Sequence, residues 1–269
     1  DGFDDVILEN QQVRLFISPK AGGRSFGFVL KSTNRNSFDS IGGLHDTFTT
    51  RFEPDDLKGL PDWTRANWLG LYNRPYVYRI PKVSGHHVEV QLAYEAPDIY
   101  PKGVKLTRTM SLDGDQNVVV ADYKITPLGI DQPQAFILEN SVPFRSFDQP
   151  SYSQWSSGGE SGREFVEDPK AIALPQNKYF ATRDKRTGET FAIMPVTSAK
   201  SLELTTGKNA ASVRITYPDF DRVGGAYAYR VAFYLGNGTV DDIDKAFRSV
   251  EMSPSHQVQV DETTRTTAP

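Results

Sequence analysis

Two neighbouring residues, His45 and Asp46, have side chains that could carry out acid–base chemistry together. An imidazole can donate or accept a proton near neutral pH, and an adjacent carboxylate can act as an acid or as a polar ligand. The pair follows Gly42 and Gly43, which allow a ligand or another backbone to approach closely. The alternative is structural, with Asp46 capping a loop and His45 exposed to solvent.

Glu139 is the third candidate for acid–base chemistry. It follows a predicted strand at residues 135–138 and precedes Arg145. A carboxylate at a strand end could donate a proton or accept hydrogen bonds from hydroxyl groups. Glu139 could equally form a structural ion pair with Arg145 or Arg108. We therefore treat it, with His45 and Asp46, as a candidate catalytic residue.

Aromatic residues mark a possible binding surface. The predicted long connections at residues 34–78 and 140–178 contain all three tryptophans. An indole ring can stack on the CH-rich face of a sugar, and Trp155 has small neighbours that would leave its ring uncovered. The alternative is that the tryptophans cover a small core within their own loops. The predicted carbohydrate-binding residues are Trp155, Trp63, Trp68, Arg74, Asp46 and Glu139.

Composition excludes several classes of function. The 269 residues contain no cysteine, so disulfide frameworks, thiolate metal sites and cysteine nucleophiles are excluded. The net charge is −4 without a basic stretch, and we expect no nucleic-acid partner. No apolar run is long enough to span a membrane. The four histidines have no metal-ligand spacing. We expect neither a metal nor a cofactor.

The two ends of the sequence bear on localisation. The chain begins with Asp1 in place of methionine and ends in a polar, threonine-rich segment. These ends favour a secreted or periplasmic protein, or one domain of a longer exported chain. No repeat or change in composition occurs before residue 253. We therefore predict a single domain at residues 1–252 and a polar tail or linker at residues 253–269.

Hydrophobic periodicity indicates strands. Apolar and polar residues alternate through most of the chain, most clearly at residues 88–94 and 226–235. Along residues 104–112, one face is apolar except for Arg108. A single helix is predicted after Thr239, which can cap it and precedes an apolar stripe of helical spacing. The pattern predicts an all-β protein with one short C-terminal helix.

Two segments resemble the galactose-mutarotase-like superfamily. Residues 8–24 end in Pro19-Lys20-Ala21-Gly22-Gly23-Arg24, which is similar to the P-x-x-G-G-R corner of the superfamily's opening hairpin. Residues 100–106 resemble its mid-domain strand pair. In length and strand order, the resemblance covers residues 5–250. It implies a β-supersandwich of two large antiparallel sheets, with a concave face that receives carbohydrate.

The chain departs from the catalytic members of this superfamily. Those members resemble one another in using a Glu base and a His acid, with a second His and an Arg that bind the sugar. Here residues 152–159 contain no histidine, and residues 227–235 contain no glutamate. These departures favour a non-catalytic accessory domain that binds an oligo- or polysaccharide. Two alternatives remain: an epimerase or glycan-cleaving enzyme with a Glu/His or Asp/Glu pair, and a structural cell-surface module without a ligand site.

Overall fold

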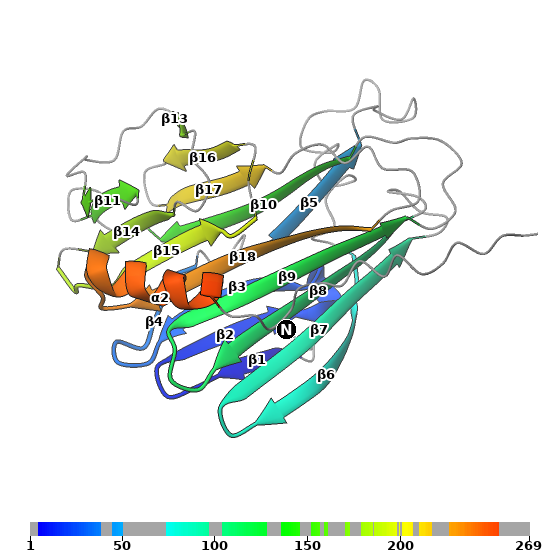
Figure 1. The fold of residues 1–269 in the computed structure, drawn as a ribbon, viewed down its shortest axis with the longest axis horizontal. Helices are drawn as coiled ribbons and strands as arrows, with labels where there is room; N and C mark the ends of the chain where they lie inside the picture. The colour runs from blue at the N-terminus through cyan, green and yellow to red at the C-terminus, as the bar shows by residue number, and fades with distance from the viewer. Residues whose placement is uncertain are drawn as a thin grey trace, which may run out of the picture.

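The computed structural model shows a mostly β protein with an α-helix near its C-terminus (Figure 1). It describes residues 5–38, 45–50, 74–96, 104–127, 136–145, 152–156, 159–160, 170–172, 179–184, 186–197, 199, 201–206, 210–216 and 226–252. Within these residues the strands form three antiparallel sheets of nine, five and four strands. The predicted all-β class with a C-terminal helix is confirmed.

The strands are β1 (Val6–Glu9), β2 (Val13–Ser18), β3 (Arg24–Leu30), β4 (Arg35–Asn36), β5 (His45–Thr50), β6 (Val77–Ser84), β7 (His87–Ala96), β8 (Val104–Asp113), β9 (Val118–Pro127), β10 (Phe136–Arg145), β11 (Tyr152–Ser156), β12 (Gly159–Glu160), β13 (Lys170–Ile172), β14 (Phe180–Asp184), β15 (Thr190–Pro195), β16 (Ser201–Thr206), β17 (Ala210–Thr216) and β18 (Tyr227–Gly236). A 3₁₀ helix, η1 (Pro19–Ala21), lies between β2 and β3, and the α-helix is α2 (Val240–Met252).

The nine-stranded sheet forms one layer of the molecule. Its strand order is β12-β11-β14-β15-β18-β9-β8-β7-β6. From β6 to β9 the strands form a meander, in which each strand pairs with the next. β18 then returns from late in the sequence to pair with β9 on one side and β15 on the other. The sheet therefore joins two parts of the chain through a single central strand.

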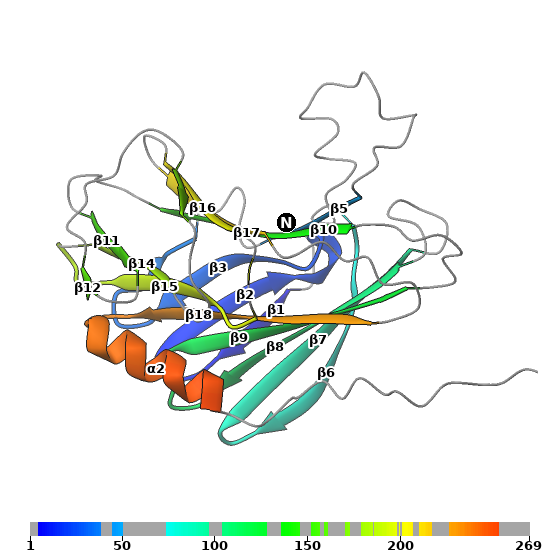
Figure 2. The same cartoon turned by 45° about the horizontal axis from the view of Figure 1, so that its top comes forward.

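The two smaller sheets form the second layer (Figures 1 and 2). In the four-stranded sheet β1-β2-β3-β4, β1 contacts β7 and β8, and β3 contacts β18. The five-stranded sheet has the order β13-β16-β17-β10-β5. Its Leu202, Val213 and Ile215 belong to the same core as the apolar residues of β2 and β3. The predicted two-layer sandwich is confirmed, with the second layer divided into two sheets.

Strand periodicity builds the core between the layers. On β8, for example, Leu106, Arg108, Met110 and Leu112 are buried, while the residues between them are half-buried on the outer face. Successive side chains of a strand point to opposite faces, so the alternation in the sequence selects the buried face. Arg108 shares this face and is completely buried.

Helix α2 covers part of the outer face of the nine-stranded sheet (Figure 2). Its Ile243, Phe247 and Val250 pack with small residues of the sheet, including Ala192 and Ala232. Side chains three and four residues apart form one stripe on a helix, and alanines opposite that stripe let the helix approach closely.

The helix begins where the sequence predicts. The side chain of Thr239 accepts a hydrogen bond from the backbone N–H of Asp242 at 3.4 Å, and the Asp242 carboxylate accepts one from the Thr239 N–H at 2.8 Å. This reciprocal cap supplies acceptors for N–H groups that have no partner inside the helix. The predicted capping role of Thr239 is confirmed.

Short turns gather at one end of the nine-stranded sheet, which we call the hairpin end. The β6–β7 and β8–β9 turns touch there, because the backbone N–H of Gly114 donates to the His86 carbonyl at 2.8 Å.

Asn10, in the β1–β2 turn, ties the second layer to the first. Its amide donates to two carbonyls of the β8–β9 turn, at 2.8 and 2.7 Å, and its oxygen accepts from the Val13 N–H at 2.8 Å.

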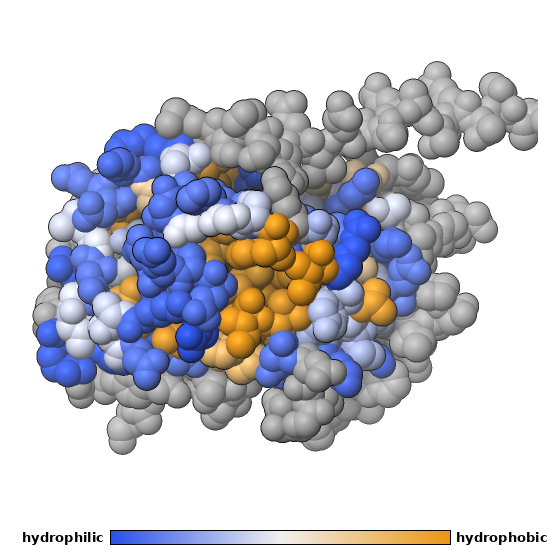
Figure 3. Space-filling model, turned by 90° about the horizontal axis from the view of Figure 1, so that it is seen from below, coloured by the Kyte–Doolittle hydropathy of each residue, from blue (hydrophilic) through white to orange (hydrophobic). Residues whose placement is uncertain are grey.

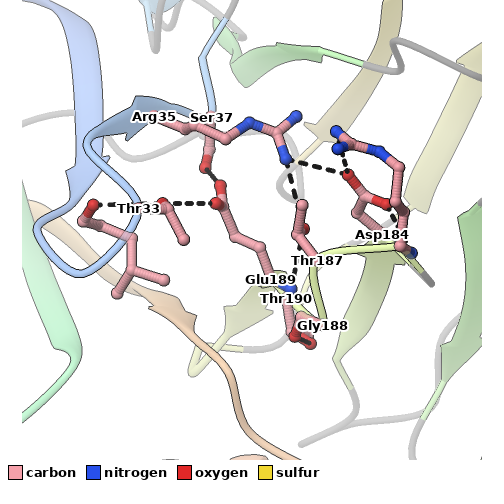
Figure 4. A network of polar contacts seen from close by, with 10 residues as sticks. Thr33, Arg35, Ser37, Asp184, Thr187, Gly188, Glu189 and Thr190 are labelled. Atoms are coloured by element: carbon pink, nitrogen blue, oxygen red, sulfur yellow. Dashed lines mark hydrogen bonds and ion pairs between the residues drawn. The ribbon is translucent and has the colours of Figure 1, made fainter.

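A polar clasp also joins the layers at the hairpin end (Figure 4). It links the residues around β4 to the turn between β14 and β15. Glu189 accepts hydrogen bonds from the hydroxyls of Thr33 at 2.9 Å and Ser37 at 2.6 Å. Asp184, which is almost completely buried, accepts one from the Arg35 guanidinium at 3.0 Å. Both buried carboxylates thus have donors from the other layer.

Candidate functional site

Tyrosines gather on the core face at the opposite end of the nine-stranded sheet, which we call the tyrosine end. Four of them lie on β7, β9 and β18, and the fifth directly precedes β6. The register places them in two adjacent rows across the sheet, because Tyr123 pairs with Tyr229 and Ile125 with Tyr227. The tyrosine cluster consists of Tyr76, Tyr94, Tyr123, Tyr227 and Tyr229.

Arg108 forms the centre of this end. It pairs with Tyr123, which pairs in turn with Tyr229, so three polar side chains occupy one row of the core face. The two tyrosine rings are stacked, with centroids 4.4 Å apart and an interplanar angle of 5°. The Arg108 guanidinium carbon lies 6.0 Å from the Tyr123 centroid, within the range of a cation–π contact. The buried charge of Arg108 is therefore packed against the aromatic row.

The glycine corner of the N-terminal hairpin makes room for Arg108. Its guanidinium donates a hydrogen bond to the Gly23 carbonyl. Gly23 has a φ of +60°, and a Cβ at this position would lie 2.8 Å from a guanidinium nitrogen of Arg108. Both the left-handed backbone and the close approach favour glycine. The Gly22-Gly23 pair that the sequence marked as a corner therefore receives the buried arginine.

Tyr76 connects the same corner to β6. Its backbone N–H donates to the Pro19 carbonyl at 2.9 Å, and its ring lies 5.6 Å from that of Tyr94. Arg74, two residues earlier, is half-buried and close enough for its charge to influence Tyr94. Arg74 is the predicted binding residue whose side chain the structure describes, and it lies beside the tyrosine cluster.

Two phenols of the cluster, those of Tyr94 and Tyr227, have a raised pKa. Burial raises the pKa of Tyr94, and the positive charge of Arg74 offsets only part of that effect. Burial also raises the pKa of Tyr227. A neutral phenol can both donate and accept a hydrogen bond, and its ring presents an apolar face. The cluster can therefore bind hydroxyl groups and CH surfaces, and the raised pKa of Tyr94 and Tyr227 keeps these two phenols neutral near pH 7.

The long connections of the chain attach at the tyrosine end. Residues 97–103 join β7 to β8 there, and residues 51–73 lead into Arg74 ahead of β6. The predicted stacking residues Trp63 and Trp68 belong to residues 51–73 and lie outside the described part of the chain. Their segment nevertheless joins the described chain next to the cluster.

The predicted acid–base residues lie on two paired strands of the five-stranded sheet. His45 and Asp46 open β5, where the sequence suggested a loop, and they pair with Ser141 and Asn140. Glu139 pairs with Thr47 inside β10. The expectation that Glu139 ends a strand is wrong, because β10 runs on from Phe136 to Arg145. The apolar alternation stops near residue 138, but pairing with β5 and β17 keeps the backbone extended.

Trp155 occupies a different sheet from these residues. It lies within β11, in place of the predicted loop, and pairs with Ala181 of β14 and Glu160 of β12. The side chains of His45, Asp46, Glu139 and Trp155 lie outside what the structure describes. The backbone brings the first three together and puts Trp155 on the nine-stranded sheet.

The tyrosine cluster was not predicted as a site from the sequence. Two signals could have found it. Arg108 is the one charged residue in an otherwise apolar alternation, and Tyr227 and Tyr229 share a face with the core residues of β18. Identifying the cluster required knowing that β18 pairs with β9, a contact across roughly one hundred residues.

Within the described residues, no group of three or more potential ligands could hold a metal ion. None of the helices in this part of the chain is long and apolar enough to cross a membrane.

Comparisons with known proteins show the fold. No family profile matches the chain, and no curated protein matches it in sequence. A galactose mutarotase related enzyme from Lactobacillus acidophilus has a similar structure, with a TM-score of 0.65 and 8% identity over 87% of this chain and 97% of that one. A 4-alpha-glucanotransferase from Thermococcus litoralis matches with a TM-score of 0.58 and 14% identity, over 87% of this chain and 40% of the enzyme.

A TPR-domain containing protein from Parabacteroides distasonis is also similar, with a TM-score of 0.63 and 11% identity over 88% of this chain. This chain spans about half of that protein, 48% of its length. At these identities the likeness concerns the fold alone. The chain has the galactose mutarotase-like β fold, which occurs in carbohydrate-active enzymes and in multidomain proteins.

Proposed function

We propose that this protein binds an oligo- or polysaccharide at the tyrosine end of its nine-stranded sheet and acts as a non-catalytic domain of an exported protein. The observation that carries the proposal is the row formed by Arg108, Tyr123 and Tyr229, with the half-buried Tyr227 and Arg74 beside it. Aromatic faces and fixed hydrogen-bonding groups are what a sugar requires from its site.

The depth of burial assigns separate roles within the cluster. Arg108, Tyr123 and Tyr229 are at most 3% exposed and form a rigid floor. Arg74 and Tyr227 are half-buried, so a ligand can reach part of each side chain. Sites of this kind gain affinity from a preorganised base, because little ordering is needed on binding.

The proposal favours binding over catalysis because of the groups at this end. The described polar residues of the cluster are tyrosines and arginines, and the pKa of Tyr94 and Tyr227 is raised further above the neutral range by burial. Epimerisation or hydrolysis requires an acid and a base matched to the working pH. A binding domain needs only the aromatic and hydrogen-bonding surface.

Titration of intrinsic tryptophan fluorescence with a panel of oligo- and polysaccharides tests the proposal. We expect a saturable change with at least one glycan and no turnover of that glycan. Arg74→Gln should weaken the binding about tenfold, the loss of about one charge-assisted hydrogen bond. Arg248→Gln, on the exposed face of α2, is the matched control and should leave Kd unchanged. If none of the glycans binds, the result would support the alternative of a structural cell-surface module without a ligand site.

One observation favours a second candidate, a sugar-active enzyme. His45 pairs with Ser141, and Glu139 is two residues from Ser141 on the same strand. Positions 45 and 139 are therefore diagonal neighbours in an antiparallel ladder, typically about 7–8 Å apart. A Glu/His pair at that spacing could transfer protons to and from a sugar.

Turnover assays on the bound glycan separate the two candidates. The enzyme candidate predicts a bell-shaped pH–rate profile and the loss of turnover in both Glu139→Gln and His45→Ala, with binding retained. The binding proposal predicts no turnover in the unchanged protein at any pH. A measurable rate that Glu139→Gln abolishes would replace the first proposal with the second.

A further inference from the structure

The two layers of the sandwich end at different strands on one side of the molecule. β1, an edge strand of the four-stranded sheet, contacts β7 and β8, whereas the nine-stranded sheet continues past β7 to β6. Neighbouring strands are about 5 Å apart, so the second layer is about one strand narrower than the first on this side. We call this side of the sandwich, formed by β1 and β6, the open edge.

The side chains of β6 that face the second layer are apolar and exposed. Tyr78 pairs with Leu92 and Val83 pairs with Val88, and both partners face the core. Tyr78 and Val83 therefore point toward the second layer, yet they are 47% and 72% exposed, and Ile80 between them is 55% exposed. Figure 3 shows a continuous hydrophobic surface on this side of the molecule. Exposed apolar patches of this kind usually mark an interaction site.

β1 contributes an open backbone edge beside this apolar surface. In the described part of the chain, β1 pairs with β2 alone. The other side of β1 therefore presents backbone N–H and C=O groups to which a further strand can add. A strand added there would lie one spacing beyond β1, above β6, and every second side chain would point onto Tyr78 and Val83. One extended segment would thus complete both the backbone ladder and the apolar contact.

A second copy of this chain does not fit the open edge. If two copies paired through β1, the nine-stranded sheets would collide, because β6 of each copy extends beyond β1 into the space under the added strand. If two copies paired antiparallel through β6, a gap two strands wide would remain above the pair. Arg79 of one copy would also lie opposite Lys82 of the other, and like charges directly opposite are destabilising. The space therefore suits a single strand that brings no sheet of its own.

The residues of β1 that face away from the core define the charge of this strand. Glu9 is already paired with Arg14, at 2.7 Å, and with Lys31. Asp5, just before the other end of β1, is exposed and shares the side of Ile7 by strand alternation. Side chains directly opposite in a ladder interact, and opposite charges or paired apolar groups there are stabilising. The added strand should therefore have a basic residue opposite Asp5 and an apolar residue opposite Ile7.

We infer that the open edge binds an extended segment of a partner polypeptide, which pairs with β1 as a fifth strand of its sheet and covers Tyr78, Ile80 and Val83. The side chains of this segment that face β6 are apolar, and a lysine or arginine lies opposite Asp5. The partner is recognised by strand addition, and the binding of a glycan at the tyrosine end plays no part in this inference.

A synthetic peptide tests the inference on the full chain. The probe is fluorescein-labelled Gly-Thr-Val-Ile-Val-Lys-Gly. When it pairs antiparallel to β1, its valines point toward β6, its isoleucine lies opposite Ile7 and its lysine lies opposite Asp5. We expect a saturable rise in fluorescence anisotropy as the protein is added. The absence of binding would overturn the inference.

Two N-methylated forms of the peptide separate strand addition from non-specific apolar contact. One form is methylated at the backbone nitrogens of both valines, and the other at those of the threonine and the isoleucine. Successive amides of an extended chain point to opposite sides, so only one form loses its hydrogen bonds to β1. That form should bind about tenfold more weakly than the other. Equal affinities of the two forms would overturn the inference.

Two aspartate variants of β6 locate the contact. Val83→Asp puts a charge on the face that the peptide covers and should weaken its binding about tenfold. Val77→Asp is the matched control, because Val77 is 74% exposed but pairs with Ala93 on the outer face of the sheet. It should leave the affinity unchanged. Both positions are exposed, so neither variant should unfold the protein. Equal effects of the two variants would overturn the inference.

A charge swap tests the position of the basic residue. Asp5→Lys should weaken binding of the peptide, and replacing the peptide's lysine with glutamate should restore the affinity for this variant. Affinity that the swap fails to restore would contradict the pairing with Asp5. Light scattering of the unmodified protein checks the remaining occupant. A mass of two chains that Val83→Asp, but not Val77→Asp, returns to one would assign the open edge to a second copy and overturn the inference.

Discussion

The two ends of the nine-stranded sheet are built differently. At the hairpin end, the core face carries Val88, Leu112, Val119 and Phe233 in one row, and short turns join the strands. At the tyrosine end, the corresponding row contains Arg108, Tyr123 and Tyr229, and longer connections follow. The same strands thus have an aliphatic, tightly tied end and a polar, aromatic end.

Under the proposed function, this difference places the ligand site at one end of the sheet and the tightest packing at the other. The hairpin end has apolar packing, the hydrogen bonds of Asn10 and the polar clasp of Glu189 and Asp184. Each of these contacts joins the two layers or adjacent turns. The tyrosine end instead presents half-buried Arg74 and Tyr227 on a rigid floor. The tyrosine end also joins the two layers, because Arg108 donates a hydrogen bond to the Gly23 carbonyl and the Tyr76 N–H donates one to the Pro19 carbonyl. Its half-buried side chains, Arg74 and Tyr227, can therefore vary more freely than its buried row.

The largest expected effect is at Phe233. Phe233→Ala should lower the free energy of unfolding by about 3–5 kcal/mol, because a fully buried aromatic ring leaves a cavity. Tyr227→Ala, at the other end of the same strand, should cost about 1 kcal/mol, since its side chain is only half-buried. Urea unfolding of both variants measures the difference. Equal costs would remove the distinction between the two ends.

The second-largest expected effect on the free energy of unfolding is at Asn10. Asn10→Ala removes four hydrogen bonds of its side chain and should cost about 2–3 kcal/mol, partly because carbonyls of the β8–β9 turn lose their donors. Gln11→Ala, the exposed neighbour in the same turn, should change stability by less than about 0.5 kcal/mol. Thermal unfolding of the two variants side by side checks the prediction. A small effect of Asn10→Ala would mean that water replaces its bonds.

The clasp should make stability depend on pH. Burial acts to raise the pKa of Asp184, but hydrogen bonds from Arg35, the Arg186 backbone and Thr187 outweigh it and hold the pKa below its ordinary value. A carboxyl with a lowered folded-state pKa stabilises the fold above its unfolded value of 3.8 and loses that contribution as pH falls.

Arg35→Gln should therefore cost about 1–2 kcal/mol at pH 7, and this cost should shrink as pH falls below about 4. Arg186→Gln is the control, because its guanidinium is largely exposed and 3.8 Å from the same carboxylate. Denaturation at pH 7 and pH 3 measures both. A cost that is independent of pH would show that Arg35 contributes by packing alone.

The smallest expected effect is at Glu9, on the surface of the hairpin end. Hydrogen bonds from Arg14 and Lys31 lower its pKa from 4.5 to about 2, so its contribution is present above pH 4.5 and is lost toward pH 2. The carboxylate is 39% exposed, and solvent screens it. Glu9→Gln should cost less than about 1 kcal/mol, and 0.5 M salt should remove the difference. A larger, salt-resistant cost would show that surface charge also stabilises this end.

Local sequence patterns predicted the helix, the glycine corner and the buried face of β8. Pairing between distant strands determined the features that the sequence did not predict. The helix after Thr239, the glycine corner at Gly22-Gly23 and the core face of β8 follow from capping, backbone and periodicity rules, and all three are confirmed. These features depend on residues within a few positions of one another.

The predicted long connections contain strands that local sequence patterns could not predict. The segments at 34–78 and 140–178 contain β5 and β11 to β13, so the expectation of uninterrupted connections is wrong. β5 reads His-Asp-Thr-Phe-Thr-Thr and β11 reads Tyr-Ser-Gln-Trp-Ser, without apolar alternation. Their strand conformation comes from partners distant in the sequence. For the same reason the tyrosine cluster, built by the pairing of β9 with β18, was not predicted as a site.

The return of β18 to the centre of the nine-stranded sheet also sets an order of assembly. The meander from β6 to β9 can form from consecutive segments, but β9 then has an open edge until roughly one hundred further residues have been synthesised. Contacts across so long a loop close slowly, because the entropy of the loop must be lost before the pairing forms. The tyrosine floor is therefore completed only when β18 arrives, and a nascent chain that stops earlier exposes both a sheet edge and an unfinished site.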